Sequence, residues 1–321
     1  MIRRLWPWLR VLVAAGILAL LAWRLGADAF LDGLRGIDVA TALAALGIGL
    51  ATTVCSAWRW CVVARGLGLR LPLGAAVADY YRALLLNAVL PAGVLGDVHR
   101  AVSHGHRSGD LGGGVRAVVL ERFAGQIALI AVAGVVLLTG PSLPFALAPG
   151  LIAAVAVAVA GLSLLVPAVR RASVTFWRDA RRGVLTRRAL MPVAVASVAT
   201  VAGHLALFLV AARVAGADVP VAALLPLLVL ALLVMALPIN VGGWGPREAF
   251  LAVAFAATGW DPAHGLATSV AYGVLAVIAA MPGVIPLVSR QPSAARWSSN
   301  AATSPASWSR PVRAETSDGR R

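Results

Sequence analysis

Eight polar or charged side chains stand inside or beside strongly apolar sequence. In chain order they are Asn87, Asp97, Arg100, Glu121, Arg122, Asn240, Arg247 and Glu248. Hydrocarbon excludes such groups unless they have partners or a polar ligand. A guanidinium bonds two phosphate oxygens at once through its planar fork, and a nearby carboxylate can neutralise it when the phosphate has left. We therefore predict that these eight residues bind an anionic substrate.

Arg247 and Glu248 follow a broken backbone. Residues 237–246 read Leu-Pro-Ile-Asn-Val-Gly-Gly-Trp-Gly-Pro between two apolar runs. Proline and glycine end a helix, and broken backbone at membrane depth is tolerated only inside protein or beside a water-filled cavity. A returning half-helix is expected to begin at Arg247, where its N-terminus and the guanidinium both favour phosphate. Asn240 is then either a cap of the broken backbone or a ligand.

A second break precedes Arg100. Residues 90–97 read Leu-Pro-Ala-Gly-Val-Leu-Gly-Asp, and Asn87 stands just before them. Asp97 and Arg100 form either an intramembrane ion pair that receives a phosphate or an ion pair at the cytoplasmic interface with both groups in water. Hydrogen bonding between helices explains Asn87 as well as ligand binding does.

The pair Glu121 and Arg122 lies near the inner end of an apolar run. Such a pair either faces a site or belongs to the interface, with the long arginine reaching out to water. A single histidine, His204, stands in a later apolar run and is expected to make a contact between helices.

Composition identifies the class of protein. Of 321 residues 60% are hydrophobic, and the mean hydropathy of +0.87 excludes a soluble globular protein. The net charge of +15 comes from arginine alone. The arginines are bunched between apolar runs, as in cytoplasmic loops, which argues against nucleic-acid binding. Cys55 and Cys61 suggest neither a disulfide framework nor a metal site, and no Walker A motif or cofactor motif is present.

The fold class we predict is an all-α polytopic membrane protein with about six spanning helices and two oppositely oriented re-entrant hairpins. The expected spans cover residues 1–23 (a retained signal anchor), 39–61, 115–138, 145–166, 189–212 and 265–288. Trp58, Arg59 and Trp60 are expected to anchor the second span at the interface. Residues 170–188 hold seven arginines and one aspartate, which places that loop and both termini in the cytoplasm.

The two broken segments resemble each other. Both contain Leu-Pro, then glycines, then an arginine followed within two residues by alanine. Charge alone gives the two halves opposite orientations, so residues 39–138 and 189–288 form an inverted repeat with a tip proline, Pro91 or Pro238, in each hairpin. Chance similarity of two short Pro/Gly breaks is the alternative. In transporters an inverted repeat places the substrate near the midplane between discontinuous helices.

The chain resembles a known family, the flippase-like membrane proteins that share the membrane region of lysylphosphatidylglycerol synthases. The motifs that carry the likeness are Asn87 to Arg100, Glu121-Arg122 and Leu237 to Glu248, and the likeness runs over roughly residues 5–288 in order and spacing. The resemblance implies translocation of lipids or lipid-linked head groups across the cytoplasmic membrane. The full synthases carry a soluble aminoacyl-transfer domain, whereas residues 289–321 are expected to be a disordered cytoplasmic tail too short for one.

Three functions are therefore compared. The first is a flippase, without cofactor or metal, that passes an anionic lipid or lipid-linked head group through a polar cavity between the hairpins. The second is an intramembrane enzyme that acts on a lipid head group, with Glu121, Glu248 or a histidine as base. The third is a non-catalytic membrane partner protein. No spacing of nucleophile and base favours the enzyme.

Overall fold

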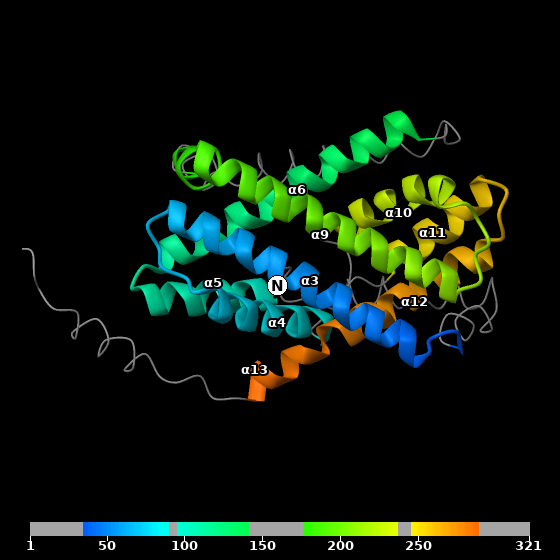
Figure 1. Cartoon of the computed structure of the whole chain (residues 1–321), viewed down its shortest axis with the longest axis horizontal. Helices are drawn as coiled ribbons and strands as arrows, with labels where there is room; N and C mark the ends of the chain where they lie inside the picture. Colours follow the sequence, from blue (N-terminus) through cyan, green and yellow to red (C-terminus); the bar gives the residue numbers. More distant parts are fainter. Residues whose placement is uncertain (1–34, 90–94, 141–175, 237–244, 289–321) are drawn as a thin grey trace, which may run out of the picture. The chain divides into compact units, whose positions relative to one another are not determined.

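The fold is all-helical, as the sequence predicts. The computed structural model describes residues 35–89, 95–140, 176–236 and 245–288, which form helices joined by turns, with no strand among them (Figure 1). The apolar runs form helices because a helix satisfies its own backbone hydrogen bonds, which water cannot do inside a bilayer. The predicted polytopic membrane protein is confirmed.

Four helices are long and apolar enough to cross a membrane. They are α3 (Val39–Gly66), α6 (Leu111–Thr139), α9 (Arg187–Val214) and α12 (Pro262–Ala280), the last extended to Pro286 by η1 (Met281–Gly283) and α13 (Val284–Val288). They correspond to four of the six predicted spans. The other two, residues 1–23 and 145–166, lie outside the described residues, as does the tail 289–321.

Two hairpins stand between these spans. The first consists of α4 (Leu73–Val89) and α5 (Leu95–Ser108), and the second of α10 (Val221–Ala236) and α11 (Pro246–Ala257). Each helix is shorter than the ~20 residues that a crossing needs. Helix α4 ends before the Leu-Pro at 90–91 and α10 before the Leu-Pro at 237–238, whereas the predicted breaks themselves, with Pro91 and Pro238, lie outside the described residues.

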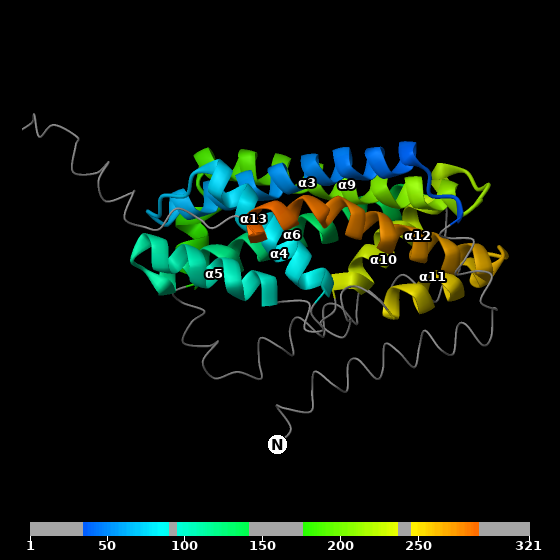
Figure 2. The same cartoon turned by 90° about the horizontal axis from the view of Figure 1, so that it is seen from below.

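The two halves of the chain run in opposite directions. Figures 1 and 2 agree that α4 and α5 open toward the end where α3 finishes, whereas α10 and α11 open toward the opposite end, where α9 finishes. Thus α9 runs against α3, and α12 runs against α6. This is the inverted repeat expected from the arginine distribution.

Glycines let the helices approach closely. Helix α3 packs on both α9 and α12. A Cβ added at Gly203 of α9 would lie 2.1 Å from Thr52 Cγ2, and one at Gly49 of α3 would lie 2.5 Å from Ala279 Cβ. Small residues of this kind allow the dense packing that drives helix association in lipid. The spans therefore form a tightly packed support for the hairpins.

Acidic side chains cap three of the spans. Asp38 accepts a hydrogen bond from the Thr41 amide (2.8 Å) at the start of α3, Asp110 accepts one from Gly113 (2.8 Å) at α6, and Asp261 accepts one from Ala263 (2.8 Å) at α12. These bonds satisfy amides that the helix leaves unpaired. The bonds from Thr41 also lower the pKa of the exposed Asp38.

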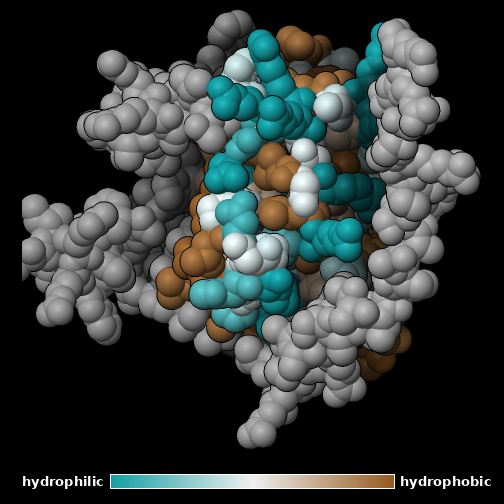
Figure 3. All heavy atoms as spheres, turned by 90° about the vertical axis from the view of Figure 1, so that its left-hand side faces the viewer, coloured by the Kyte–Doolittle hydropathy of each residue, from teal (hydrophilic) through white to brown (hydrophobic). Residues whose placement is uncertain are grey.

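One end of the bundle is basic. Figure 3 looks onto the end where α3 finishes and α6 begins, and hydrophilic side chains gather there. The exposed arginines at the ends of these helices and in residues 176–188 are Arg65, Arg70, Arg107, Arg178, Arg181, Arg182, Arg187 and Arg188. By the positive-inside rule we expect this end to face the cytoplasm.

Cysteine labelling tests that orientation. In a background without Cys55 and Cys61, we expect Arg181→Cys to react only with reagents that reach the cytoplasm. Asp218→Cys, which is exposed in the turn between α9 and α10 at the other end, should react only from outside. Reaction of position 181 with an impermeant reagent added outside would contradict the orientation.

A glycine pair on α6 tests the packing of the first hairpin. A Cβ at Gly114 would lie 2.6 Å from the Gly105 nitrogen and 2.7 Å from the Ala101 oxygen of α5, whereas one at Gly134 meets nothing within 4 Å. Gly114→Ala should lower the free energy of unfolding by about 1–3 kcal/mol, because backbone must move. Gly134→Ala should leave it unchanged or raise it, since alanine favours helix. Thermal unfolding in detergent distinguishes them, and equal midpoints would refute the predicted contact.

Candidate functional site

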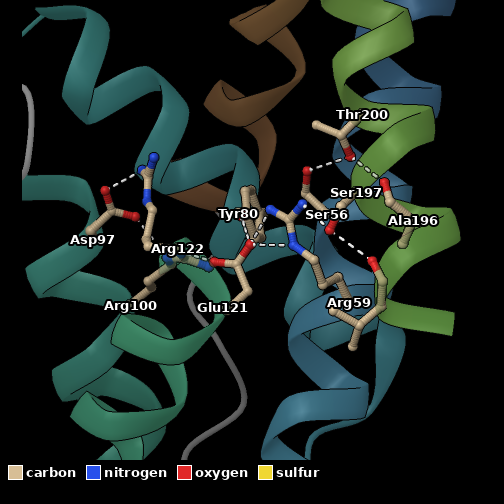
Figure 4. Close-up of polar contacts among 11 residues, drawn as sticks. Ser56, Arg59, Tyr80, Asp97, Arg100, Glu121, Arg122, Ala196, Ser197 and Thr200 are labelled. Carbon is tan, nitrogen blue, oxygen red and sulfur yellow. Dashed lines mark hydrogen bonds and ion pairs between the residues drawn. The ribbon is translucent and has the colours of Figure 1, made fainter. Parts of the chain in front are cut away.

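A buried carboxylate joins four helices. Glu121 on α6 has no exposed surface. Its Oε1 accepts hydrogen bonds from Arg59 Nε of α3 (2.9 Å), from Arg59 Nη2 and from the Tyr80 hydroxyl of α4 (2.8 Å). Its Oε2 accepts one from Arg100 Nη2 of α5 (2.6 Å), as Figure 4 shows. Both oxygens are thus held by cations, which compensates the cost of burying the charge.

Arg100 is the buried cation of the first hairpin. Its Nε donates to Asp97 Oδ1 (2.8 Å) one turn earlier on α5. The guanidinium carbon lies 4.3 Å from the centre of the Tyr80 ring and 4.9 Å from that of Trp60. Arginine stacks well on aromatic faces because it is weakly hydrated and planar. Its Nη1, in contrast, has no hydrogen-bond partner among the described residues.

Arg122 is the outward-facing cation of the same group. It forms an ion pair with Asp97 Oδ2, and 47% of its side chain is exposed, compared with 14% for Asp97. Asn87 of α4 accepts a hydrogen bond from the Gly96 amide (2.8 Å), and its Nδ2 lies 3.5 Å from Asp97 Oδ2. Asn87 thereby caps α5 across the break of the hairpin, which is the interhelical role considered above.

The five charged residues just described form what we call the hairpin-1 cluster. It comprises three guanidiniums and two carboxylates, Arg59, Arg100, Arg122, Asp97 and Glu121, and so carries one net positive charge. A surplus positive charge beside apolar helices is costly unless water or an anion compensates it, and the half-exposed Arg122 is open to both. Arginine-rich groups of this kind suit phosphate and carboxylate ligands.

Arg59 was misplaced by the sequence analysis. Arg59 and Trp60 are 5% and 0% exposed, so the predicted interface anchor is wrong for both, and only Trp58, at 41%, lies at the surface. Arg59 Nη1 also donates to Ser197 Oγ of α9 (3.1 Å) and so links the two repeats. The spacing of polar residues could have indicated this burial. Ser56 and Arg59 are three residues apart and so lie on one face of the helix.

The second hairpin holds a separate pair. Arg247 and Glu248 are 2% and 0% exposed. Glu248 Oε1 accepts hydrogen bonds from Arg247 Nη2 (2.5 Å) and from Ser269 Oγ of α12 (3.0 Å). Its Oε2 accepts one from the Gly245 amide (2.5 Å), whose φ of +101° suits glycine. Glu248 thus caps α11 while it neutralises Arg247.

Arg247 is also bonded to the span behind it. Its Nε donates to Ser269 Oγ (2.7 Å) and its Nη2 to the Ser269 carbonyl (2.9 Å). The guanidinium carbon lies 5.0 Å from the ring centre of Tyr272, another residue that the sequence analysis missed. The predicted site residues therefore form two groups, one at each hairpin. Asn240 lies outside the described residues.

Replacement of Glu121 tests the buried network. Glu121→Ala leaves Arg59 and Arg100 buried without their common partner, so the free energy of unfolding should fall by roughly 3–5 kcal/mol. Asp218→Ala is the control, because the Arg213–Asp218 pair at 3.9 Å is exposed, and no measurable change is expected. Thermal unfolding in detergent reports both, and an equally small change at the two positions would contradict a buried network.

Comparison with known proteins agrees with this architecture. The family model described as the lysylphosphatidylglycerol synthase TM region matches residues 8–283. Searches of curated proteins and of solved structures found no match. The matched segment contains both hairpins, all four described spans except the last residues of the fourth, and every residue of the two charged groups. The chain therefore belongs to the family of the lysylphosphatidylglycerol synthase transmembrane region.

Proposed function

We propose that this protein translocates an anionic lipid, or the anionic head group of a lipid-linked molecule, across the cytoplasmic membrane. The observation that carries the proposal is the surplus positive charge of the hairpin-1 cluster. The lipid tails stay in hydrocarbon, and only the head group enters the protein. A phosphate that neutralises this charge offsets the cost of bringing an anion into the membrane.

Arg122 is the residue that first meets the head group in this proposal. Its side chain is the most exposed of the three guanidiniums, and its ion pair with Asp97 is partly open to solvent. A phosphate that takes the place of Asp97 would accept bonds from the forks of Arg122 and Arg100. The unpartnered Nη1 of Arg100 supplies a donor for this exchange.

Glu121 is better suited to hold cations than to remove a proton. Both of its oxygens accept hydrogen bonds from guanidiniums. A general base needs an oxygen that can accept the proton of the substrate, and donors of the protein already bond both oxygens of Glu121. This arrangement favours a binding role over the enzymatic alternative, in which Glu121 was a candidate base. For the non-catalytic partner protein, a surplus positive charge beside a buried ion-pair network would have no evident use.

Arg247 and Glu248 remain candidate substrate residues in this account. Their hydrogen bonds to each other and to Ser269 give a neutral pair with no surplus charge. We propose that the head group reaches this pair second, after it leaves the hairpin-1 cluster. An ion gradient, or an unequal concentration of the lipid in the two leaflets, supplies the energy for translocation.

Transport by purified protein tests the proposal. In liposomes with fluorescent phosphatidylglycerol, wild-type protein should move the lipid between leaflets. Arg122→Ala should reduce the apparent affinity about ten- to a hundredfold, because a charge-assisted hydrogen bond contributes about 1.5–3 kcal/mol. Arg122→Lys should recover only part of this, since lysine lacks the planar fork.

The matched control is Arg213→Ala, which removes an exposed arginine at the other end of the bundle. It should transport as wild type does. A protein that inserts correctly but moves no lipid would overturn the flippase proposal, and turnover of the head group by that protein would favour the enzyme. Equal transport by Arg122→Ala and wild type would remove the hairpin-1 cluster from the mechanism.

A further inference from the structure

His204 lies on the face of α9 that contacts the charged network. Ser197, Thr200 and His204 are three and four residues apart, which places them on one side of the helix. Helix α3 runs the other way along this face, with Arg59 bonded to Ser197 (3.1 Å) and Ser56 to Thr200 (3.2 Å). His204 therefore stands about two turns from the contact between Arg59 and Ser197.

On its other side His204 contacts the second hairpin's group. Its Nδ1 lies 3.2 Å from the Tyr272 hydroxyl of α12. The Tyr272 ring stacks on Phe208 at 3.7 Å between centres, and the Arg247 guanidinium lies 5.0 Å from the same ring. The histidine thus stands between the two charged groups and takes no part in the ion pairs of either group.

The charged groups around His204 come from several helices. Arg59 and Arg122 belong to the hairpin-1 cluster, and Arg59 lies about two turns from His204 on this face, where its positive charge opposes a second one on the ring. Glu121 of α6 is held by arginines, α12 contributes the Tyr272 hydroxyl, and Val221–Ala236 of α10 contains no titratable residue. Beside the neighbouring Gly203, α3 places Thr52 and Ile48, which carry no charge. Neutralising the hairpin-1 cluster would therefore make a positive charge on His204 less costly.

We propose that His204 is the proton-carrying residue of translocation, and that it gains a proton when an anionic head group neutralises the hairpin-1 cluster. This inference rests on the proposed function. The proton adds to the ring nitrogen that carries no hydrogen in the neutral imidazole and gives an imidazolium. The Tyr272 hydroxyl can both donate and accept, so it remains a partner in either state. One proton then accompanies one monoanionic head group.

Thermodynamic linkage makes the two binding events reciprocal. If a bound anion strengthens proton binding by some factor, a bound proton strengthens anion binding by the same factor. Removing one net charge from a site within the same bundle should change the proton affinity of the ring about tenfold. Uptake of the head group together with the proton is favoured on the side of the membrane where both are abundant. Lipid movement is thereby coupled to a proton gradient.

Histidine titration measures this linkage directly. The full chain carries ¹⁵N-labelled histidine in micelles, and His204→Gln identifies the resonances of His204. We expect short-chain phosphatidylglycerol to raise the proton affinity of His204 about tenfold, and zwitterionic short-chain phosphatidylcholine to leave it unchanged. The exposed His264 is the internal control. In Arg122→Ala the response should be lost. An identical titration of wild-type His204 with and without phosphatidylglycerol would overturn the inference.

Transport measurements distinguish a failure of this inference from a failure of the proposed function. In liposomes containing a pH-sensitive dye, wild-type protein should carry protons with phosphatidylglycerol and respond to an imposed pH gradient. His204→Gln should lose the response to the gradient, whereas Tyr272→Phe, which keeps the imidazole, should retain it. Lipid movement by wild type without any response to the gradient would refute proton coupling alone. Absence of lipid movement would refute the proposed function, even if the titration showed linkage.

Discussion

The rest of the structure depends on the burial of the Glu121 carboxylate between Arg59 and Arg100. Removing either partner leaves a charge uncompensated in a low-dielectric interior, so this contact ties α3, α5 and α6 to one arrangement. Because one carboxylate faces two guanidiniums, and Asp97 also faces two, the group cannot become neutral on its own. The same geometry that fixes the first hairpin therefore leaves a place for an anion.

The two hairpins are related by inverted symmetry but differ in electrostatics. In each, a helix break is followed by an arginine that lies over a tyrosine ring, Tyr80 for Arg100 and Tyr272 for Arg247. In the second hairpin the neutralising glutamate comes from the hairpin itself and also caps its helix. In the first, Arg100 pairs with Asp97 of the same hairpin and with Glu121 of the span α6. Relative movement of the hairpin and the span would thus separate an arginine from its glutamate only in the first hairpin. The first hairpin is therefore the better candidate for a conformational change that depends on a bound anion.

The sequence was most informative about chain direction and helix breaks. Arginine bunching predicted the opposite orientation of the halves, and Leu-Pro with glycines located both breaks, because these signals depend on local chemistry. Side-chain partners across helices are set by tertiary packing, which local patterns do not encode. Arg59 was therefore taken for an interface residue although it is buried against Glu121, and Tyr80, Ser197 and Tyr272 were missed. Aromatic residues flanking an arginine were the misleading signal.

The most direct test of the anion site is a cryo-electron microscopy structure of the protein in nanodiscs that contain phosphatidylglycerol. We predict density for a head-group phosphate within hydrogen-bond distance of Arg122 and the Nη1 of Arg100, with Asp97 displaced from at least one of its arginines. A map in which the five charged residues keep their mutual ion pairs, while phosphatidylglycerol occupies only the outer surface of the spans, would contradict the account.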